Sequence, residues 1–250
     1  MKSEKSFWSF PTILGSISVF ALVASTSVEA DTVAQWTFET SFLATSVTSA
    51  TIGPLAPEVV GFGSTGAATG SHAGATTVWS SPSGNASLKS LSANLWAQTS
   101  DYFQFAVTPA GGGYTYSGIT ISYDQNGSGT GPKTFSFSYS TDGTTFTPVG
   151  SDYALASGST WATSGPTLAS QESFDLTTVT ALNTAPTWYF RITDDSPVTA
   201  GAVGGGNVGT AGTDRVDNFT VNAIVVPEPG SLALVGGFGL LLGSFLRKRK

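Results

Sequence analysis

The chain has 250 residues, of which 10% are charged and 12% are aromatic, and it contains no cysteine. The lack of cysteine excludes disulfides and thiolate metal sites. Most basic residues lie in the two terminal segments, so residues 31–226 carry 13 acidic side chains against four basic ones. Because this negative charge repels phosphate backbones, it argues against a nucleic-acid partner.

The N-terminal 30 residues have the layout of a secretory signal peptide. Two lysines precede an apolar stretch at residues 10–24, and Val28 and Ala30 are small enough for the −3 and −1 positions of a signal-peptidase site. We therefore predict that signal peptidase removes residues 1–30 by cleaving before Asp31. The alternative is an uncleaved anchor helix, which the modest length of the apolar stretch disfavours.

The other end, residues 227–250, has three parts in a fixed order. Pro227, Glu228 and Pro229 come first, the uncharged segment 230–246 follows, and the final four residues are Arg247, Lys248, Arg249 and Lys250. Seventeen helical residues measure about 25 Å, just enough to cross the hydrocarbon core of a bilayer. The basic cluster is expected to stay cytoplasmic, which places the preceding domain outside the inner membrane.

This tripartite segment resembles the PEP-CTERM sorting signal. The resemblance implies that an exosortase processes the chain near Pro227 to Pro229, after an inner-membrane intermediate held by residues 230–246. It further implies delivery to the cell surface or extracellular matrix of a Gram-negative bacterium that makes exopolysaccharide. The alternative is a plain membrane anchor, in which the two prolines merely end a strand.

The intervening residues 31–226 predict a single all-β domain, most simply a β-sandwich of the jelly-roll type. The run 134–139 alternates aromatic with hydroxyl side chains, which is the period-two pattern of a strand with one buried face. No stretch shows sustained helical periodicity. The expected strands are residues 33–39, 76–79, 102–107, 119–123, 134–139, 145–149, 173–176, 188–193 and 216–225.

Several motifs that could carry chemistry lack the context that the chemistry needs. Residues 61–66 and 204–209 both fit G-x-G-x-x-G, but no helix follows either, so we interpret them as loops. His72 is the only histidine, and its Gly-Ala-Ser surroundings predict a loop rather than a catalytic triad. Residues 124–129 begin like a helix-flanked calcium loop, but Phe135 occupies the position of the required Glu, so we predict a turn.

Two carboxylates suggest a structural calcium site. Glu39 ends the first expected strand and Asp217 lies in the last one, within a run similar to the closing strand of jelly-roll carbohydrate-binding-like domains. That resemblance implies neighbouring first and last strands whose carboxylates can hold Ca²⁺, a cation that prefers oxygen ligands. The alternative is that Asp217 accepts hydrogen bonds from Arg215 or from loop amides.

Three tryptophans near polar loops are candidates for contact with a glycan: Trp79, Trp96 and Trp161. Exposed aromatic rings stack on pyranose rings, although the cores of jelly rolls also use aromatic residues. A hydrolase would need paired carboxylates such as Asp194 and Asp195. Adjacent strand residues point to opposite faces, so this pair is a poor acid and base couple.

Together these features predict an exported surface or extracellular-matrix protein with a noncatalytic β-sandwich that is structural or adhesive. A carbohydrate-binding module associated with exopolysaccharide is the alternative, and a secreted hydrolase ranks third. The sequence predicts no catalytic residue and no organic cofactor.

Overall fold

A computed structural model describes residues 29–157 and 160–228 of the chain. The predicted signal peptide up to residue 28, Pro229, the apolar segment 230–246 and the basic cluster lie outside the described residues. The described helices are two short 3₁₀ turns, η1 (Leu168–Ser170) and η2 (Thr180–Thr184). Neither turn is long and apolar enough to cross a membrane.

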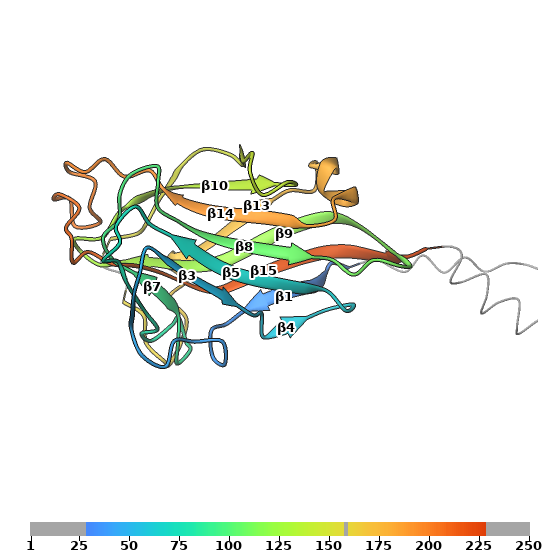
Figure 1. The fold of residues 1–250 in the computed structure, drawn as a ribbon, viewed down its shortest axis with the longest axis horizontal. Helices are drawn as coiled ribbons and strands as arrows, with labels where there is room; N and C mark the ends of the chain where they lie inside the picture. The colour runs from blue at the N-terminus through green and yellow to red at the C-terminus, as the bar shows by residue number, and fades with distance from the viewer. Residues whose placement is uncertain (1–28, 158–159, 229–250) are drawn as a thin grey trace, which may run out of the picture.

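The described residues form two antiparallel sheets that pack face to face, which confirms the expected all-β sandwich (Figure 1). The first sheet has eight strands within the described ranges. Six follow the order β13 (Gln171–Asp175), β9 (Tyr114–Gly127), β15 (Asp214–Pro227), β7 (Leu91–Ala93), β6 (Val78–Ser80) and β2 (Val47–Thr48). The other two are β1 (Asp31–Trp36), which pairs with β15, and β4 (Val59–Val60), which pairs with β1.

The second sheet has seven strands in the part of the chain that the structure describes. Six follow the order β11 (Thr147–Pro148), β10 (Thr134–Ser140), β14 (Trp188–Asp194), β8 (Tyr102–Thr108), β5 (Thr65–Ser71) and β3 (Thr51–Leu55), and β12 (Tyr153–Ala154) pairs with β10. Each strand expected from the sequence overlaps an observed one. The short strands β2, β3, β4, β7 and β12 and the longer β5 were not predicted.

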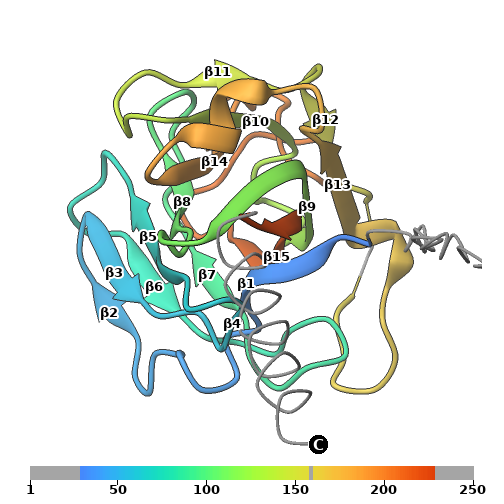
Figure 2. The same cartoon turned by 90° about the vertical axis from the view of Figure 1, so that its right-hand side faces the viewer.

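Two long strands, β9 and β15, run along the whole sandwich and define its two ends. Tyr114 pairs with Pro227 at one end, and Gly127 pairs with Asp214 at the other. We call these the C-terminal tip and the far end; Figure 2 looks onto the C-terminal tip. The first strand, β1, pairs with the last, β15, as the jelly-roll resemblance implies. Pro227 is thus part of β15, so the strand continues into the first residue of the Pro-Glu-Pro motif.

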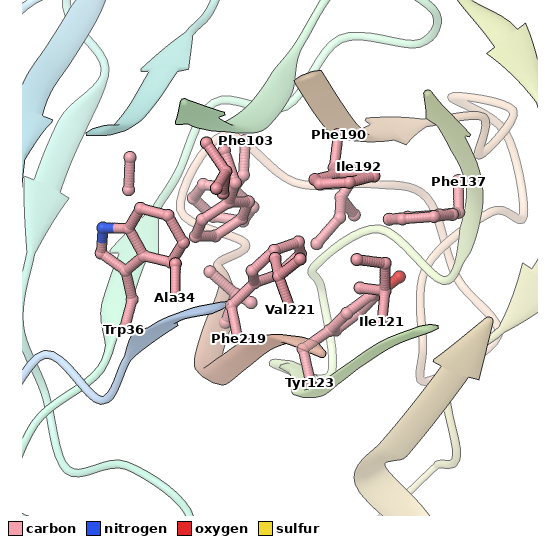
Figure 3. Packing of buried hydrophobic residues seen from close by; sticks show 14 of the residues in the cluster. Ala34, Trp36, Phe103, Ile121, Tyr123, Phe137, Phe190, Ile192, Phe219 and Val221 are labelled. Carbon is pink, nitrogen blue, oxygen red and sulfur yellow. The ribbon is translucent and has the colours of Figure 1, made fainter. Parts of the chain in front are cut away.

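Aromatic rings from both sheets fill the space between them (Figure 3). Phe105 of β8 stacks on Phe219 of β15 with ring centroids 3.6 Å apart, and Trp36 of β1 contacts both rings edge-on. In β10, Phe135 and Phe137 are buried, which confirms the period-two pattern for residues 134–137; beyond them Tyr139 is half-buried and Ser138 is buried. Burial of large aromatic side chains on two facing sheets provides the main stabilisation of a sandwich without disulfides.

Strand β5 explains how the tryptophans fit into this core. It contains only small side chains, and two of its residues are glycines that face tryptophan rings. A Cβ atom on Gly70 would lie 2.2 Å from Cη2 of Trp79, and one on Gly66 would lie 2.9 Å from Cζ2 of Trp36. The prediction that Gly66 belongs to a loop is therefore wrong, because it lies in a strand where only glycine leaves room for the neighbouring ring.

Candidate functional site

A row of polar side chains crosses four strands on the outer face of the first sheet. Ser80 of β6 pairs with Ser92 of β7, Ser92 pairs with Arg215 of β15, and Arg215 pairs with Asn126 of β9. Directly paired residues point to the same face of a sheet, and successive residues alternate between faces. Because Val216 is in the core, these four residues lie on the side away from it.

Two loops, residues 82–90 and 160–167, cover part of this outer face and are bonded to each other. The backbone N–H of Ala86 donates to the carbonyl oxygen of Ala162 at 2.9 Å. The backbone N–H of Thr167 donates to Oδ1 of Asn85 at 2.6 Å, and the Asn85 amide donates in return to the Thr167 carbonyl oxygen. The two loops therefore stabilise each other above the sheet.

Beside these loops lies a pocket of about 580 Å³, which we call the tryptophan pocket. Its floor is the polar row, and Trp161 of the second loop forms one wall. The Arg215 guanidinium lies 4.8 Å from the centroid of the Trp161 ring, and its Nη1 donates to the carbonyl oxygen of Ser83 at 2.8 Å. This contact fixes the ring against the sheet.

The indole N–H of Trp161 has no hydrogen-bond partner among the described residues. Trp161 is only 7% exposed, and a buried indole N–H usually finds an acceptor, since leaving it unpaired costs about 1–3 kcal/mol. The indole nitrogen is itself inaccessible, so what the pocket offers a ligand is a cationic side chain, Arg215, and a row of hydroxyl and amide groups. That combination suits a ligand rich in oxygen atoms.

A second pocket of about 500 Å³ lies on the same face, and we call it the acidic pocket. Asp124 of β9 pairs with Asp217 of β15 at a β-bulge, where Asn218 has a φ of 52°. Asn218 Nδ2 donates to Oδ2 of Asp124 at 2.7 Å and lies 3.4 Å from Oδ2 of Asp217. One amide therefore contacts both carboxyl groups, and Gln171 lies opposite Asp124 on β13.

Burial changes the acidity of the carboxyl groups in and beside the acidic pocket. Desolvation raises the pKa of Asp217 to about 7, against the opposing hydrogen bonds from Ser87, Asn85 and Asn218. Desolvation also raises the pKa of Glu172, which lines the pocket, to about 7, and it raises the pKa of Asp124. Near neutral pH the carboxyl groups of Asp217 and Glu172 can therefore both donate and accept protons.

The two carboxylates proposed to bind calcium both contact the loop at residues 82–90. Glu39 Oε1 accepts the backbone N–H groups of Leu88 and Lys89 at 2.7 and 2.9 Å. Asp217 Oδ2 accepts the N–H of Asn85 and the hydroxyl of Ser87. Backbone N–H groups of this loop therefore donate to both carboxylates. For Asp217 this agrees with the alternative to calcium binding, in which the carboxylate accepts hydrogen bonds from loop amides. Among the described residues, no group of three or more His, Cys, Asp or Glu side chains is placed to hold a metal ion.

A measurement of melting temperature tests the calcium hypothesis. Because hydrogen bonds already hold the loop through Glu39 and Asp217, we expect the same melting temperature in excess Ca²⁺ and in EDTA. Differential scanning calorimetry of the purified chain provides the comparison. A higher melting temperature in Ca²⁺, lost in Asp217→Asn, would instead support a structural calcium ion, since a ligand that binds only the folded state stabilises it.

The predicted exposure of the three candidate tryptophans is wrong. Trp79 is fully buried and donates from Nε1 to the carbonyl oxygen of Ser49 at 2.9 Å, and Trp96 donates to that of Ala93 at 2.9 Å. The core takes up both rings because Gly70 leaves space for one and His72 packs against both. Trp161 is also nearly buried, but it lines the tryptophan pocket.

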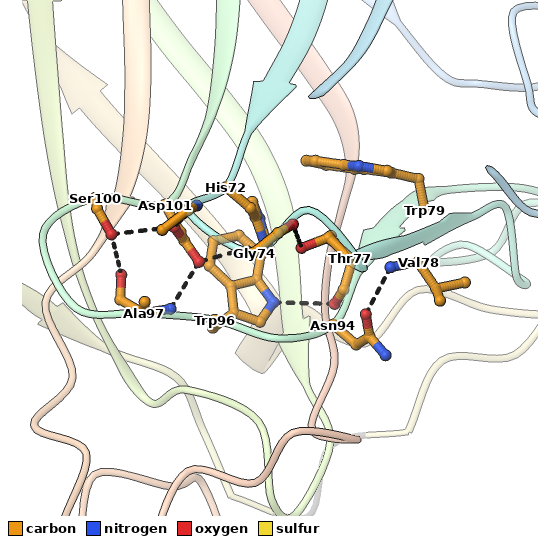
Figure 4. Close-up of polar contacts among 12 residues, drawn as sticks. His72, Gly74, Thr77, Val78, Trp79, Asn94, Trp96, Ala97, Ser100 and Asp101 are labelled. Atoms are coloured by element: carbon orange, nitrogen blue, oxygen red, sulfur yellow. Dashed lines mark hydrogen bonds and ion pairs between the residues drawn. The ribbon is translucent and has the colours of Figure 1, made fainter. Parts of the chain in front are cut away.

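His72 directly follows β5 and is buried, so it is not in an exposed loop (Figure 4). Its ring centroid lies 4.3 Å from that of Trp96 and 4.7 Å from that of Trp79, and its Nδ1 is 3.3 Å from Oδ2 of Asp101. Desolvation lowers the pKa of His72, against the opposing charge of Asp101. Asp101 also accepts the backbone N–H of Ala73, so the cluster ties the end of β5 to β8. Its position is that of a packing residue.

The adjacent carboxylates of a hypothetical hydrolase do not share a surface. Asp194 is buried and accepts the backbone N–H of Ser196 at 2.8 Å, whereas Asp195 is partly exposed. Desolvation raises the pKa of Asp194 to about 6. Sequence reasoning missed the polar row and the partner of Trp161, because these depend on the register of four strands.

Comparison with solved structures finds several distant β-sandwich neighbours. The CBM22-1–GH10 modules of xylanase 10B from Clostridium thermocellum, complexed with xylohexaose, show 14% identity over 77% of this chain and 28% of that one, with a TM-score of 0.40. The CBM22-1 xylan-binding domain of Paenibacillus barcinonensis Xyn10C shows 10% identity over 80% and 98%, with a TM-score of 0.39. The K1 cleaved adhesin domain of Lys-gingipain from Porphyromonas gingivalis shows 13% identity over 75% and 95%, with a TM-score of 0.34.

A comparison with the curated proteins finds no match. A family model does match the C-terminal end of the chain: residues 225–250 fit the PEP-CTERM protein-sorting motif. This confirms the resemblance of the tripartite segment, and it implies an exported protein that an exosortase processes. The chain is therefore a PEP-CTERM sorting domain-containing protein.

Proposed function

We propose that the protein resides at the cell surface or in the extracellular matrix and that its β-sandwich is a noncatalytic adhesive module for exopolysaccharide. The tryptophan pocket carries this proposal, because it places Arg215, held against the Trp161 ring, beside a floor of hydroxyl and amide groups. Sugars present many hydroxyl oxygens, which such groups bind. The sorting motif supports the same setting, because it directs the chain out of the cell.

The burial of Trp161 determines how the pocket would hold a sugar. Only 7% of this residue is exposed and Arg215 lies over its ring, so the ring has little free surface for stacking. The guanidinium of Arg215 and the polar row would therefore bind a sugar by hydrogen bonds, while the Trp161 ring forms the wall beside them. Because residues 31–226 carry a strong negative charge, the favoured partner is an uncharged polysaccharide rather than an acidic one.

A glycan array on the purified protein tests this proposal. We expect binding to uncharged glycans and a loss of about tenfold or more in affinity for Trp161→Ala, which corresponds to about 1.4 kcal/mol. Trp161→Phe is the matched control, because it retains a six-membered aromatic ring at the pocket wall and loses only the five-membered ring with its N–H. Because Trp161 is nearly buried, Trp161→Ala is also expected to lower the melting temperature, so binding is compared at a temperature at which the wild type and both variants are folded. Absence of any glycan binding, or equal binding by Trp161→Ala, would contradict the proposal.

The acidic pocket favours a second candidate function, that of a secreted hydrolase. Burial raises the pKa of Glu172, which lines this pocket, to about 7, and a carboxyl group with a pKa near 7 is typical of general acid–base catalysis. The noncatalytic proposal predicts no turnover of labelled polysaccharides by the wild-type protein. If the wild type cleaved labelled polysaccharides and Glu172→Gln did not, the noncatalytic proposal would be wrong and the hydrolase function would be supported.

A further inference from the structure

The C-terminal tip exposes three large apolar side chains: Phe62, Tyr114 and Val226. They are 37%, 37% and 42% exposed, respectively. The rings of Phe62 and Tyr114 contact each other with centroids 5.6 Å apart. Tyr114 lies opposite Pro227, the residue after Val226, so all three belong to the same end of the sandwich. We call these three residues the apolar tip.

The backbone holds Phe62 in place on this tip. Its φ of 56° is unusual for a large residue and persists only where the surroundings enforce it. The preceding Gly61 donates its N–H to the carbonyl oxygen of Val33 at 3.0 Å, and the following turn closes with a bond from the N–H of Ser64 to the carbonyl oxygen of Gly61. The bond to β1 and the turn at residues 61–64 thus hold the Phe62 backbone in place, although the Phe62 side chain is exposed.

The apolar tip lies next to the point at which the sorting segment begins. Glu228, the last described residue, donates its backbone N–H to the carbonyl oxygen of Gly113 at 2.8 Å. The uncharged segment begins at residue 230, and two residues of extended chain reach at most about 7 Å. If residues 230–246 cross a bilayer, the tip therefore lies at the surface of that bilayer.

We propose that the apolar tip contacts the lipid headgroup region of the inner membrane on its outer side while residues 230–246 are inserted. Tyrosine and other amphipathic aromatic residues favour this interface, where the ring meets acyl chains and the hydroxyl meets water. Contact with lipid would orient the sandwich so that its far end and both pockets face away from the membrane. This inference rests on the proposed export topology and is independent of glycan binding.

The lack of cysteine makes a clean labelling experiment possible. The full chain is reconstituted into vesicles of phosphatidylethanolamine and phosphatidylglycerol after labelling a single introduced cysteine with an environment-sensitive fluorophore. Tyr114→Cys and Val226→Cys report on the tip. Val198→Cys is the control, because Val198 is also apolar and exposed, at 61%, and its loop lies at the far end, where Gly209 of the same loop donates its N–H to the carbonyl oxygen of Thr130.

We expect nitroxide-bearing lipids to quench the labels at residues 114 and 226 and to leave the label at residue 198 unquenched. Adding Phe62→Ser to Val226→Cys should reduce the quenching, because it removes an apolar contact with lipid. The short chain between residue 226 and the inserted segment is the same in both proteins, so a reduction shows that quenching depends on the apolar contact and not only on that tether. The proposal would be overturned if all three labels reported an aqueous environment and none was quenched by the nitroxide-bearing lipids. It would also be overturned if the full chain did not remain in the vesicles. If the labels at residues 114 and 226 left the aqueous environment only after exosortase was added, the apolar tip would contact a protein partner and not lipid, and the proposal would be wrong.

Discussion

Replacing Gly70 with alanine is expected to lower the free energy of unfolding by about 3 kcal/mol. The added Cβ would lie 2.2 Å from Cη2 and 2.5 Å from Cζ3 of Trp79. This tryptophan cannot easily move aside, because it is fully buried, donates to the carbonyl oxygen of Ser49 and packs against His72. The midpoint and slope of urea-induced unfolding measure the effect.

Gly206→Ala is the matched control for this substitution. A Cβ on Gly206 would meet no atom within 4 Å, so its unfolding free energy should stay within about 0.5 kcal/mol of the wild type. Equal stability of Gly70→Ala and the wild type would mean that the Trp79 ring does not lie across β5. The packing that buries Trp79 would then be wrong.

Stability is also expected to depend on pH in an unusual direction, with a melting temperature about 5 °C higher at about pH 5 than at about pH 8. Burial raises the pKa of Glu172 and of Asp217 to about 7 and that of Asp194 to about 6. The folded state therefore binds these protons more tightly than the unfolded state does. The resulting stabilisation is complete below the unfolded pKa of about 4 and is lost as the pH rises through the folded values.

His72 acts in the opposite direction on the acidic side. Burial lowers its pKa, so the unfolded state gains a proton first, and stability falls as the pH drops below about 6.5. Because several carboxyl groups oppose a single histidine, we expect maximum stability in mildly acidic solution. Differential scanning fluorimetry across the pH range measures the profile.

Two substitutions in β13 separate the causes of this profile. Burial alone raises the pKa of Glu172, so Glu172→Gln should reduce the loss of melting temperature between about pH 5 and about pH 8. Asp175→Asn should leave that loss unchanged, because hydrogen bonds from Thr177 lower the pKa of Asp175. A melting temperature that rises with pH in the wild type would contradict the assignment of raised carboxyl pKa values.

The strands that could be predicted from the sequence are those in which apolar and polar residues alternate locally. In β10, Phe135 and Phe137 alternate with serines, so the alternation along this short run indicates which face of the strand is buried. Strand β5 has no such signal, because its two glycines, Gly66 and Gly70, are required by the rings of Trp36 and Trp79 from other strands. A rule based on local periodicity therefore misses it.

The residues that the sequence assigns to a turn at 124–129 show the same limit. Asp, Asn and Gly favour turns, but residues up to Gly127 continue β9. Pairing of Asp124 with Gln171 on one side and with Asp217 on the other outweighs the local preference. The structure thereby brings two carboxyl groups into contact with one amide, which spacing in the sequence does not show.

The candidate site was partly predictable. The sequence indicated Trp161 because of its residue type and the polar loop around it, and Asp217 because its run is similar to the closing strand of jelly-roll domains. It could not identify Arg215 as the partner of Trp161, nor the serines beneath it, because their proximity arises from the register of β6, β7, β15 and β9. The sorting motif was readable because its three parts follow one another along the chain.

Export and sorting are tested most directly by the intact mass of the native protein isolated from the extracellular fraction of its host. We predict a mass that corresponds to a chain beginning at Asp31 and ending near residues 227–229, after removal of both terminal segments. A chain of all 250 residues in the membrane fraction, with none outside the cell, would contradict this account.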